Sequence, residues 1–260
     1  MTPSPQDPQD PWALLDGARR VLVVHAHPDD ETLSTGPLVA DLTARGVHVE
    51  LVTATRGEEG EVVPGAIAED DDRPLDEVRS AEIDGASRAL GLAARHLLGT
   101  APALAAGAGP RRYRDSGMQW IREGLAGPSD TAGEDSLTRR PLETEVADLL
   151  ALIAATGPDV IVSYDDEGTY GHPDHVRTHH LARAASAESS VPMLEISEHG
   201  AVRELPGTAA AVTAALRCYR TQLTVVSADD AGVLVRHVGG QDQLVPFAAG
   251  LRTSAHVARS

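Results

Sequence analysis

Two short strings combine histidine with aspartate in a spacing that could hold a metal ion. The string HPDD at residues 27–30 follows the apolar run VLVVHA, and HPDH at residues 172–175 follows VIVSYD. Both runs are predicted strands, and parallel strands that lie side by side bring such strings to the sheet edge where α/β proteins bind ligands. Two histidines and one aspartate form a catalytic zinc site that leaves one position open for water. The strings therefore predict a metal-dependent hydrolase.

The first string separates a metal ligand from a base. His27 and Asp30 are three residues apart, which places them on one side of a first helical turn. Asp29 then points elsewhere and is free to act on water. Proline at position 28 suits a tight turn because it fixes φ and needs no backbone donor.

The second string repeats this pattern. His172 and His175 are also three residues apart, so one can bind metal while the other faces the substrate. Asp174 between them could orient or charge a histidine, as carboxylates behind metal ligands do. Either string alone could be an ordinary turn with an aspartate helix cap. Two such strings, each after a buried strand, favour the metal site.

Composition excludes several other functions. The formal charge of −17 argues against a nucleic-acid partner and against binding to an anionic membrane. All 22 basic residues are arginine, which excludes Schiff-base lysine chemistry and a P-loop. Cys218 is the single cysteine, so no intramolecular disulfide is expected. The proline-rich N-terminus does not resemble a signal peptide, and no apolar run approaches the ~20 residues of a membrane span, so we expect a cytoplasmic protein.

The elements that must position the two strings alternate between strand and helix. This alternation predicts a doubly wound α/β fold with a mostly parallel sheet flanked by helices. We expect a flexible N-terminal tail over residues 1–17, a core over 18–190 and a small β-containing C-terminal extension over 191–260. Residues 101–140 lack periodicity, and a segment of that length is typical of binding loops or a lid.

The strings AHPDDE and GHPDH resemble those of the LmbE-like or PIG-L-like zinc-dependent N-deacetylases, over about residues 20–188. HAHPDDETLS, TRGEEGEV, RDSGM and YGHPDHVRTHH are most similar to the branch that deacetylates N-acetylglucosaminyl-inositol in mycothiol biosynthesis. The resemblance implies an acetylated sugar as the small-molecule substrate. It also implies Zn²⁺ as the cofactor, with Fe²⁺ as an alternative. The oligomeric state stays open.

Carried over by position, the resemblance implies roles for the first string and its partner. The positions that match the family's metal ligands are His27, Asp30 and His175. Asp29 matches the general base.

Other matched positions surround the reacting group. His172 matches the residue that protonates the leaving amine or stabilises the oxyanion, and Asp174 matches a residue that tunes it. Tyr170 matches a tyrosine that assists at the oxyanion. Arg79 and Asp115 match residues that hold sugar hydroxyls, whereas their sequence surroundings alone favour a surface ion pair and a solvated loop.

The chain also departs from this branch. The segment between the second string and the C-terminal strands is shorter, and Tyr219 stands in CYRTQ where relatives tend to have histidine. Three alternatives therefore remain: an amidase of mycothiol S-conjugates, a deacetylase of another glycoside such as a natural product, and a metal-free carbohydrate-binding relic.

Overall fold

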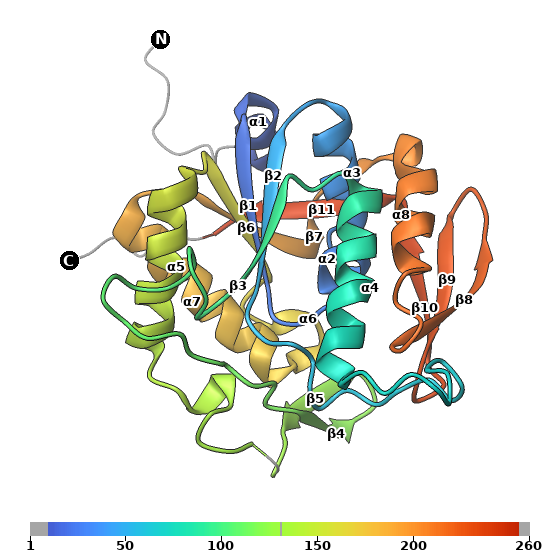
Figure 1. Cartoon of the computed structure of the whole chain (residues 1–260). Helices are drawn as coiled ribbons and strands as arrows, with labels where there is room; N and C mark the ends of the chain where they lie inside the picture. Colours follow the sequence, from blue (N-terminus) through green and yellow to red (C-terminus); the bar gives the residue numbers. More distant parts are fainter. Residues whose placement is uncertain (1–9, 131, 255–260) are drawn as a thin grey trace.

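The computed structural model describes residues 10–130 and 132–254. A six-stranded sheet forms the centre of the molecule (Figure 1). Its strands lie in the order β11 (Ala248–Thr253), β7 (Met193–Glu204), β6 (Val160–Ser163), β1 (Arg20–His25), β2 (His48–Thr53) and β3 (Ala94–Leu97). All neighbours pair in parallel except β11, which runs antiparallel to β7 at the edge. The predicted doubly wound, mostly parallel α/β fold is confirmed.

Helices cover both faces of this sheet because its central strands are apolar on both sides. Val21 and Val23 of β1 pack in one buried cluster, and the alternating Leu22 and Val24 pack in another. The first face is covered by α1 (Pro11–Gly17), α3 (Gly36–Ala44), α4 (Leu75–Leu90) and α8 (Ala209–Leu216). The second is covered by α5 (Leu142–Thr156) and α7 (Pro173–Ser189).

The sheet order places a topological switch point at the ends of β1 and β6, where open α/β sheets form their ligand crevice. From β1 the chain continues through α2 (Asp30–Leu33) and α3 to β2 on one side. From β6 it continues through α6 (Gly168–Gly171) and α7 to β7 on the other. Neighbouring strands whose connections diverge create the position where open α/β sheets bind ligands. Both histidine strings begin at this position.

Smaller sheets complete the fold. Within residues 101–140, β4 (Met118–Arg122) and β5 (Leu125–Pro128) form an antiparallel hairpin, followed by the 3₁₀ turn η1 (Leu137–Arg139). After the 3₁₀ turn η2 (Pro206–Thr208) and α8, a three-stranded antiparallel sheet contains β8 (Leu223–Ala228), β9 (Gly232–His237) and β10 (Asp242–Pro246). The predicted boundary at residue 190 stays a prediction, although β7 and β11 from beyond it complete the central sheet.

The N-terminal tail differs from its prediction over residues 11–17, which form α1. Trp12 and Leu15 are buried against the first face of the sheet. The Trp12 indole Nε1 donates to the Ala201 carbonyl at 2.8 Å, and the Arg203 guanidinium lies 4.2 Å from its ring centroid. Two large apolar side chains outweigh the polar composition that suggested disorder. Residues 1–9 lie outside the described residues.

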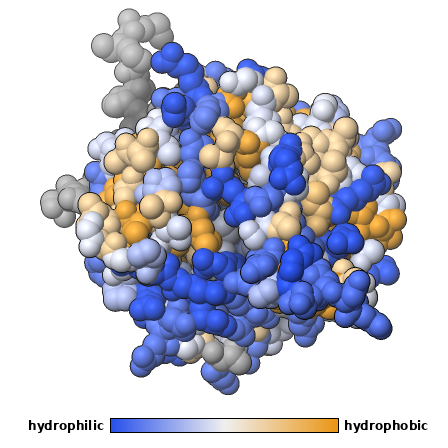
Figure 2. Space-filling view, viewed as in Figure 1, coloured by the Kyte–Doolittle hydropathy of each residue, from blue (hydrophilic) through white to orange (hydrophobic). Residues whose placement is uncertain are grey.

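The view in Figure 2 shows a mainly hydrophilic surface across the lower half of the molecule, where the loops that follow the strands gather. None of the helices in the described ranges has the length and apolar character that a membrane crossing requires.

Candidate metal centre

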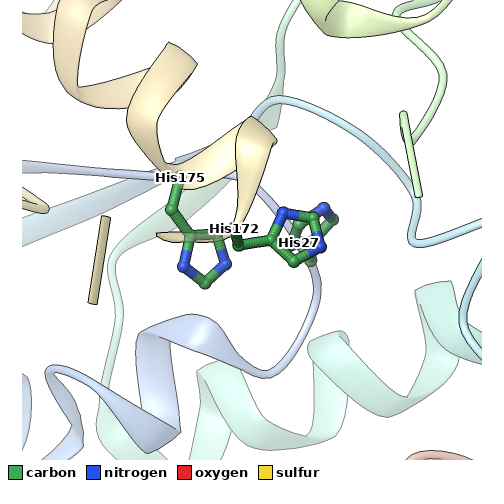
Figure 3. Close-up of side chains that lie close together, drawn as sticks. All are labelled: His27, His172 and His175. Atoms are coloured by element: carbon green, nitrogen blue, oxygen red, sulfur yellow. The ribbon is translucent and has the colours of Figure 1, made fainter. Parts of the chain in front are cut away.

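Three histidines from the two strings gather at this switch point (Figure 3). His27 lies in the turn after β1, His172 caps the N-terminus of α7, and His175 lies in that helix's first turn. Each can offer a ring nitrogen such that the nitrogens lie within 4.8 Å of one another. The structure therefore brings together the two strings as their strand positions predicted.

Asp30 lies between two of these histidines. Its Oδ2 is 3.3 Å from His27 Nδ1, and its Oδ1 is 3.3 Å from His175 Nε2. The Asp30 Oδ2 also accepts hydrogen bonds from the His27 backbone N–H at 2.9 Å and from the Tyr164 hydroxyl at 2.5 Å. The carboxylate is thus fixed from both sides before any ligand binds.

The surroundings of the two histidines fit metal ligands. His27 Nε2 lies 3.1 Å from Asp174 Oδ2, so in the tautomer with the proton on Nε2 it donates there and leaves Nδ1 toward Asp30. A carboxylate behind a metal-binding imidazole is the usual arrangement. His175 is buried, and neither of its ring nitrogens makes a hydrogen bond, although Nε2 lies 3.3 Å from Asp30 Oδ1. Buried polar atoms are rarely left unpaired, so a group that binds this imidazole would remove a cost of about 1–3 kcal/mol.

Two ligand sets share this geometry. One contains His27, Asp30 and His175, which the resemblance implied, and the other replaces Asp30 with His172. A further group of possible ligand atoms contains His27, Asp115 and Asp174.

Burial and charge act in opposite directions on the pKa values of the first string. Burial favours the neutral form of Asp30, but His175 and His27 outweigh it and hold the pKa of the carboxyl well below its usual value. Burial also disfavours the His27 imidazolium, yet Asp115, Asp174 and Asp30 raise the pKa of this histidine well above normal. A metal ion at His27 would compete with the proton that these carboxylates stabilise on the imidazole.

Asp29 occupies a left-handed backbone conformation with φ of 103° and ψ of −28°. Aspartate is among the few residues that adopt positive φ at modest cost. This turn separates its side chain from that of Asp30, and within the described ranges the Asp29 carboxylate makes no hydrogen bond. Burial, followed by the charges of Asp30 and Glu31, raises the pKa of Asp29 well above its usual value. A carboxyl with a raised pKa and no fixed partner can accept a proton.

Glu31 supports the Asp29 turn, and the sequence reasoning missed it. Its Oε2 accepts the Asp29 backbone N–H at 3.2 Å, and its Oε1 accepts the Tyr219 hydroxyl at 2.5 Å and that of Thr32. Burial raises the pKa of Glu31 to about 7. The tyrosine that stands where relatives tend to have histidine thus holds the buried glutamate behind the proposed base. The third acidic residue in HPDDE was the available signal.

Tyr164 is the second missed residue. Besides its bond to Asp30, its ring stacks on His175 with centroids 4.3 Å apart. Its hydroxyl also accepts the Ala26 backbone N–H at 2.9 Å. The signal in the sequence was its place at the end of the apolar run VIVSYD, next to the first string's strand.

His172 is held by its neighbour's backbone. Its Nδ1 accepts the Asp174 N–H at 3.2 Å, so a neutral ring carries its proton on Nε2. Burial, with the nearby His27 and His175, lowers the pKa of His172 to about 2. The Asp174 carboxylate, which the resemblance assigned to tuning His172, contacts His27 instead and accepts the Ser116 N–H at 2.9 Å.

Tyr170 lies at the mouth of the centre. Its ring centroid is 5.4 Å from that of His175 and 6.0 Å from that of His172. The preceding Thr169 has φ of 68° and ψ of −78°, a conformation that costs a β-branched residue about 1–3 kcal/mol. The strained backbone therefore places this tyrosine beside the histidines.

Arg79, predicted to bind substrate, is fully buried. Its Nη2 donates to the carbonyls of Gly60 and Glu61 at 2.9 and 3.1 Å, while Nε and Nη1 have no partner. A side chain at position 60 would place its Cβ 2.9 Å from Nη1, so this approach requires glycine. Arg79 is one of the residues that line a cavity of about 270 Å³, together with Pro28 and Arg56. Nε and Nη1 are therefore buried donors whose hydrogen-bonding capacity is unused within the described residues.

Asp115 also reaches the centre from the loop before the hairpin. Its Oδ1 lies 3.5 Å from His27 Nε2 and accepts the Gly117 N–H at 2.8 Å. Burial alone would raise its pKa, but the His27 charge and hydrogen bonds lower it. The solvated-loop interpretation is thus wrong for Asp115, since it is buried, as the surface ion-pair interpretation is for Arg79.

Comparison with known proteins gives a consistent result. Residues 22–186 match the PIG-L family model, described as GlcNAc-PI de-N-acetylase. The chain is 41% identical to the 1D-myo-inositol 2-acetamido-2-deoxy-alpha-D-glucopyranoside deacetylase of Thermobifida fusca, over 68% of this chain and 57% of the relative. It is 40% identical to the 1D-myo-inositol 2-acetamido-2-deoxy-alpha-D-glucopyranoside deacetylase 1 of Catenulispora acidiphila, over 77% of this chain and 58% of the relative.

The chain therefore spans a little more than half the length of these curated relatives. Among solved structures, N,N'-diacetylchitobiose deacetylase of Pyrococcus horikoshii superimposes with a TM-score of 0.58 and 21% identity, over 82% of this chain and 73% of that one. This likeness shows a shared fold. Since the family model covers more than half of the chain and both histidine strings, the chain belongs to the PIG-L family.

Proposed function

We propose that the protein is a zinc-dependent N-deacetylase that hydrolyses the acetamide of an N-acetylglucosamine-type sugar, with N-acetylglucosaminyl-inositol as the first candidate substrate. The observation that carries the proposal is the position of Asp30 between His27 and His175, with Asp29 turned away beside them. Membership of the PIG-L family and the names of the curated relatives support the choice of an acetylated sugar.

In this proposal His27, Asp30 and His175 hold the metal. Zinc, when bound, supplies Lewis acidity that polarises a carbonyl group and makes water more acidic. The Asp174 carboxylate orients His27 through its Nε2–H, and Tyr164 fixes Asp30. These partners determine which atoms of the ligands face the crevice.

The remaining residues act on water and on the substrate. Asp29 accepts a proton from water as the water oxygen adds to the acetamide carbon. The His172 Nε2–H donates a hydrogen bond to the oxygen that gains negative charge, and the Tyr170 hydroxyl assists there. The carbon–nitrogen bond then breaks, and the proton held by Asp29 is transferred to the departing amine. Arg79 and Asp115 hold the sugar hydroxyls, Arg79 through its unpartnered Nε and Nη1 and Asp115 through carboxylate oxygens that already accept the Gly117 and Glu59 N–H groups.

The test of function measures acetate and free amine from the zinc-loaded protein, with the chelator-treated protein as a control. The substrates are N-acetylglucosaminyl-inositol and a mycothiol S-conjugate. Preference for the first supports the proposal, whereas preference for the second assigns the related amidase activity. Lack of turnover on both, with zinc bound, would contradict this substrate assignment.

The metal assignment has its own test. Zinc at a free concentration of 100 times its Kd should raise the free energy of unfolding by about 2.7 kcal/mol. His175→Ala should abolish this increase, while the exposed His180 on the same helix provides a matched control in His180→Ala. Equal zinc stabilisation of His175→Ala and wild type would exclude His175 as a ligand. Loading with ferrous iron in parallel determines which metal supports the faster turnover.

A further inference from the structure

Two aromatic side chains beside the candidate metal centre are the ones that the fold leaves accessible. The chain has two tryptophans, four tyrosines and one phenylalanine. Five of these are buried in the core, each at most 4% exposed: Trp12, Tyr113, Tyr164, Tyr219 and Phe247. Trp120, by contrast, is 48% exposed, and Tyr170 is partly exposed. A chain with so few aromatic residues keeps its accessible ones at one place.

These two rings form a continuous surface with the centre. The Trp120 ring centroid lies 5.6 Å from that of Tyr170, with 34° between the ring planes. Tyr170 in turn lies 5.4 Å from His175. Trp120 is therefore two ring contacts from a proposed metal ligand, where a second ring joined to the reacting sugar would lie.

The hairpin that carries Trp120 is held against the second string. A Cβ at Gly171 would lie 2.9 Å from Leu125 Cδ1 and 3.1 Å from the Ala126 carbonyl oxygen, so β5 packs closely on the residue after Tyr170. Ala126 pairs with Trp120 across the hairpin. This packing fixes the position of the hairpin that carries Trp120 relative to the second string.

We propose that Trp120 and Tyr170 form a subsite for the ring attached to the acetylated sugar, a cyclitol or second pyranose. This inference rests on the proposed deacetylase function and specifies the substrate class as a glycoside rather than a free monosaccharide. The face of a saturated ring carries C–H groups that pack on an aromatic plane, while its hydroxyls remain at the edge. Aromatic side chains supply such contact area at low cost in conformational entropy.

The kinetic test compares two substrates that differ only in the attached ring, N-acetylglucosaminyl-inositol and N-acetylglucosamine. Trp120→Ala should raise KM for the glycoside about 3- to 10-fold, the effect of losing one aromatic contact, with kcat retained. KM for the monosaccharide should not change, and Trp120→Phe should restore most of the glycoside's affinity. Equal effects on both substrates, or none on either, would overturn the subsite.

Ile121 offers a matched control on the same strand. It is 64% exposed, and its Cδ1 would lie 2.3 Å from a Cβ at Gly127, so it packs over that glycine. Ile121→Ala should leave KM for both substrates unchanged. A loss equal to that of Trp120→Ala would indicate a general effect of the hairpin and contradict a specific ring contact.

A binding measurement separates failure of this inference from failure of the proposed function. Trp12 and Trp120 are the two tryptophans, and Trp12 lies under β7. Glucosaminyl-inositol should change the tryptophan fluorescence of wild type but not of Trp120→Phe, and glucosamine should change neither. If no substrate is cleaved but this response occurs, the subsite stands and the deacetylase assignment fails. If cleavage occurs without the response, the subsite is wrong.

Discussion

The two histidine strings meet at one centre, but the protein holds them differently. In the first, Asp30 is fixed by Tyr164 and Glu31 by Tyr219, both through buried hydroxyls. In the second, the His175 ring nitrogens make no hydrogen bond, although Nε2 lies 3.3 Å from Asp30 Oδ1. The hydroxyl of Tyr170, just before this string, also makes no hydrogen bond within the described part of the chain. Apart from Asp29, the first string is thus a scaffold held by buried hydroxyls, whereas the His175 ring of the second string gains a partner for its nitrogens from what it binds. The hydrogen bonds that hold the side chains of a site in place thus need not be shared evenly between the two segments that build it.

The largest effect is expected from changing the base on the scaffold side. Asp29→Asn removes the proton acceptor and should lower kcat by about 10²- to 10⁴-fold, the usual contribution of general-base catalysis. Asparagine tolerates a positive φ as aspartate does, so zinc content and Tm should stay near those of wild type. Steady-state kinetics, metal analysis and thermal melts measure the three quantities. Near-normal turnover with zinc bound would assign the base elsewhere.

A smaller effect is expected from loosening the scaffold behind a ligand. Tyr164→Phe removes the hydroxyl that donates to Asp30 and should weaken zinc binding about 10- to 100-fold, as loss of such supporting groups does. Competition with a chelator of known affinity measures this change.

Tyr113→Phe is the matched control for this variant. Tyr113 is equally buried and donates to Asp148 Oδ2 at 2.7 Å. Each variant should lose about 1–3 kcal/mol of stability, because a buried partner is left unsatisfied. Only Tyr164→Phe should lose zinc affinity. The same zinc affinity in both variants would show that the Tyr164 hydroxyl does not support Asp30 as a metal ligand.

The smallest effect concerns the backbone strain at Thr169, shortly before the second string. Thr169→Gly permits the left-handed backbone and should raise the free energy of unfolding by about 0.5–1 kcal/mol, the balance of relieved strain and added chain entropy. Turnover should fall severalfold, because Tyr170 is less firmly placed. Ser190, with φ of 60° at the C-cap of α7, supplies the control: Ser190→Gly should gain similar stability with unchanged turnover. Unchanged turnover in Thr169→Gly would show that the strain does not serve the tyrosine.

The convergence of the two strings could be predicted because it depends on local features. Apolar runs identified the strands, and parallel pairing of β1 with β6 brings His27, Asp30 and His175 to one edge. Alternation of strands and helices was enough to identify the doubly wound fold. These inferences need no knowledge of contacts between particular side chains.

The supporting contacts could not be predicted because they join distant parts of the chain. Tyr219 and Glu31 are 188 residues apart, and Tyr164 and Asp30 are 134 apart. Neither pairing has a local pattern. The helix at residues 11–17 was missed because two buried side chains, Trp12 and Leu15, outweigh a polar and proline-rich composition. The hairpin at 118–128 was hidden by a composition typical of loops.

That hairpin is a sheet of its own, since β4 and β5 pair with each other and with no strand of the central sheet. Its length and side chains can therefore vary while the register of β1 and β6 stays the same. Exchange of this hairpin between family members would be a compact way to redirect one hydrolytic centre to differently decorated sugars. Trp120 and the two histidine strings thus lie on separate segments of backbone, which can be changed one without the other.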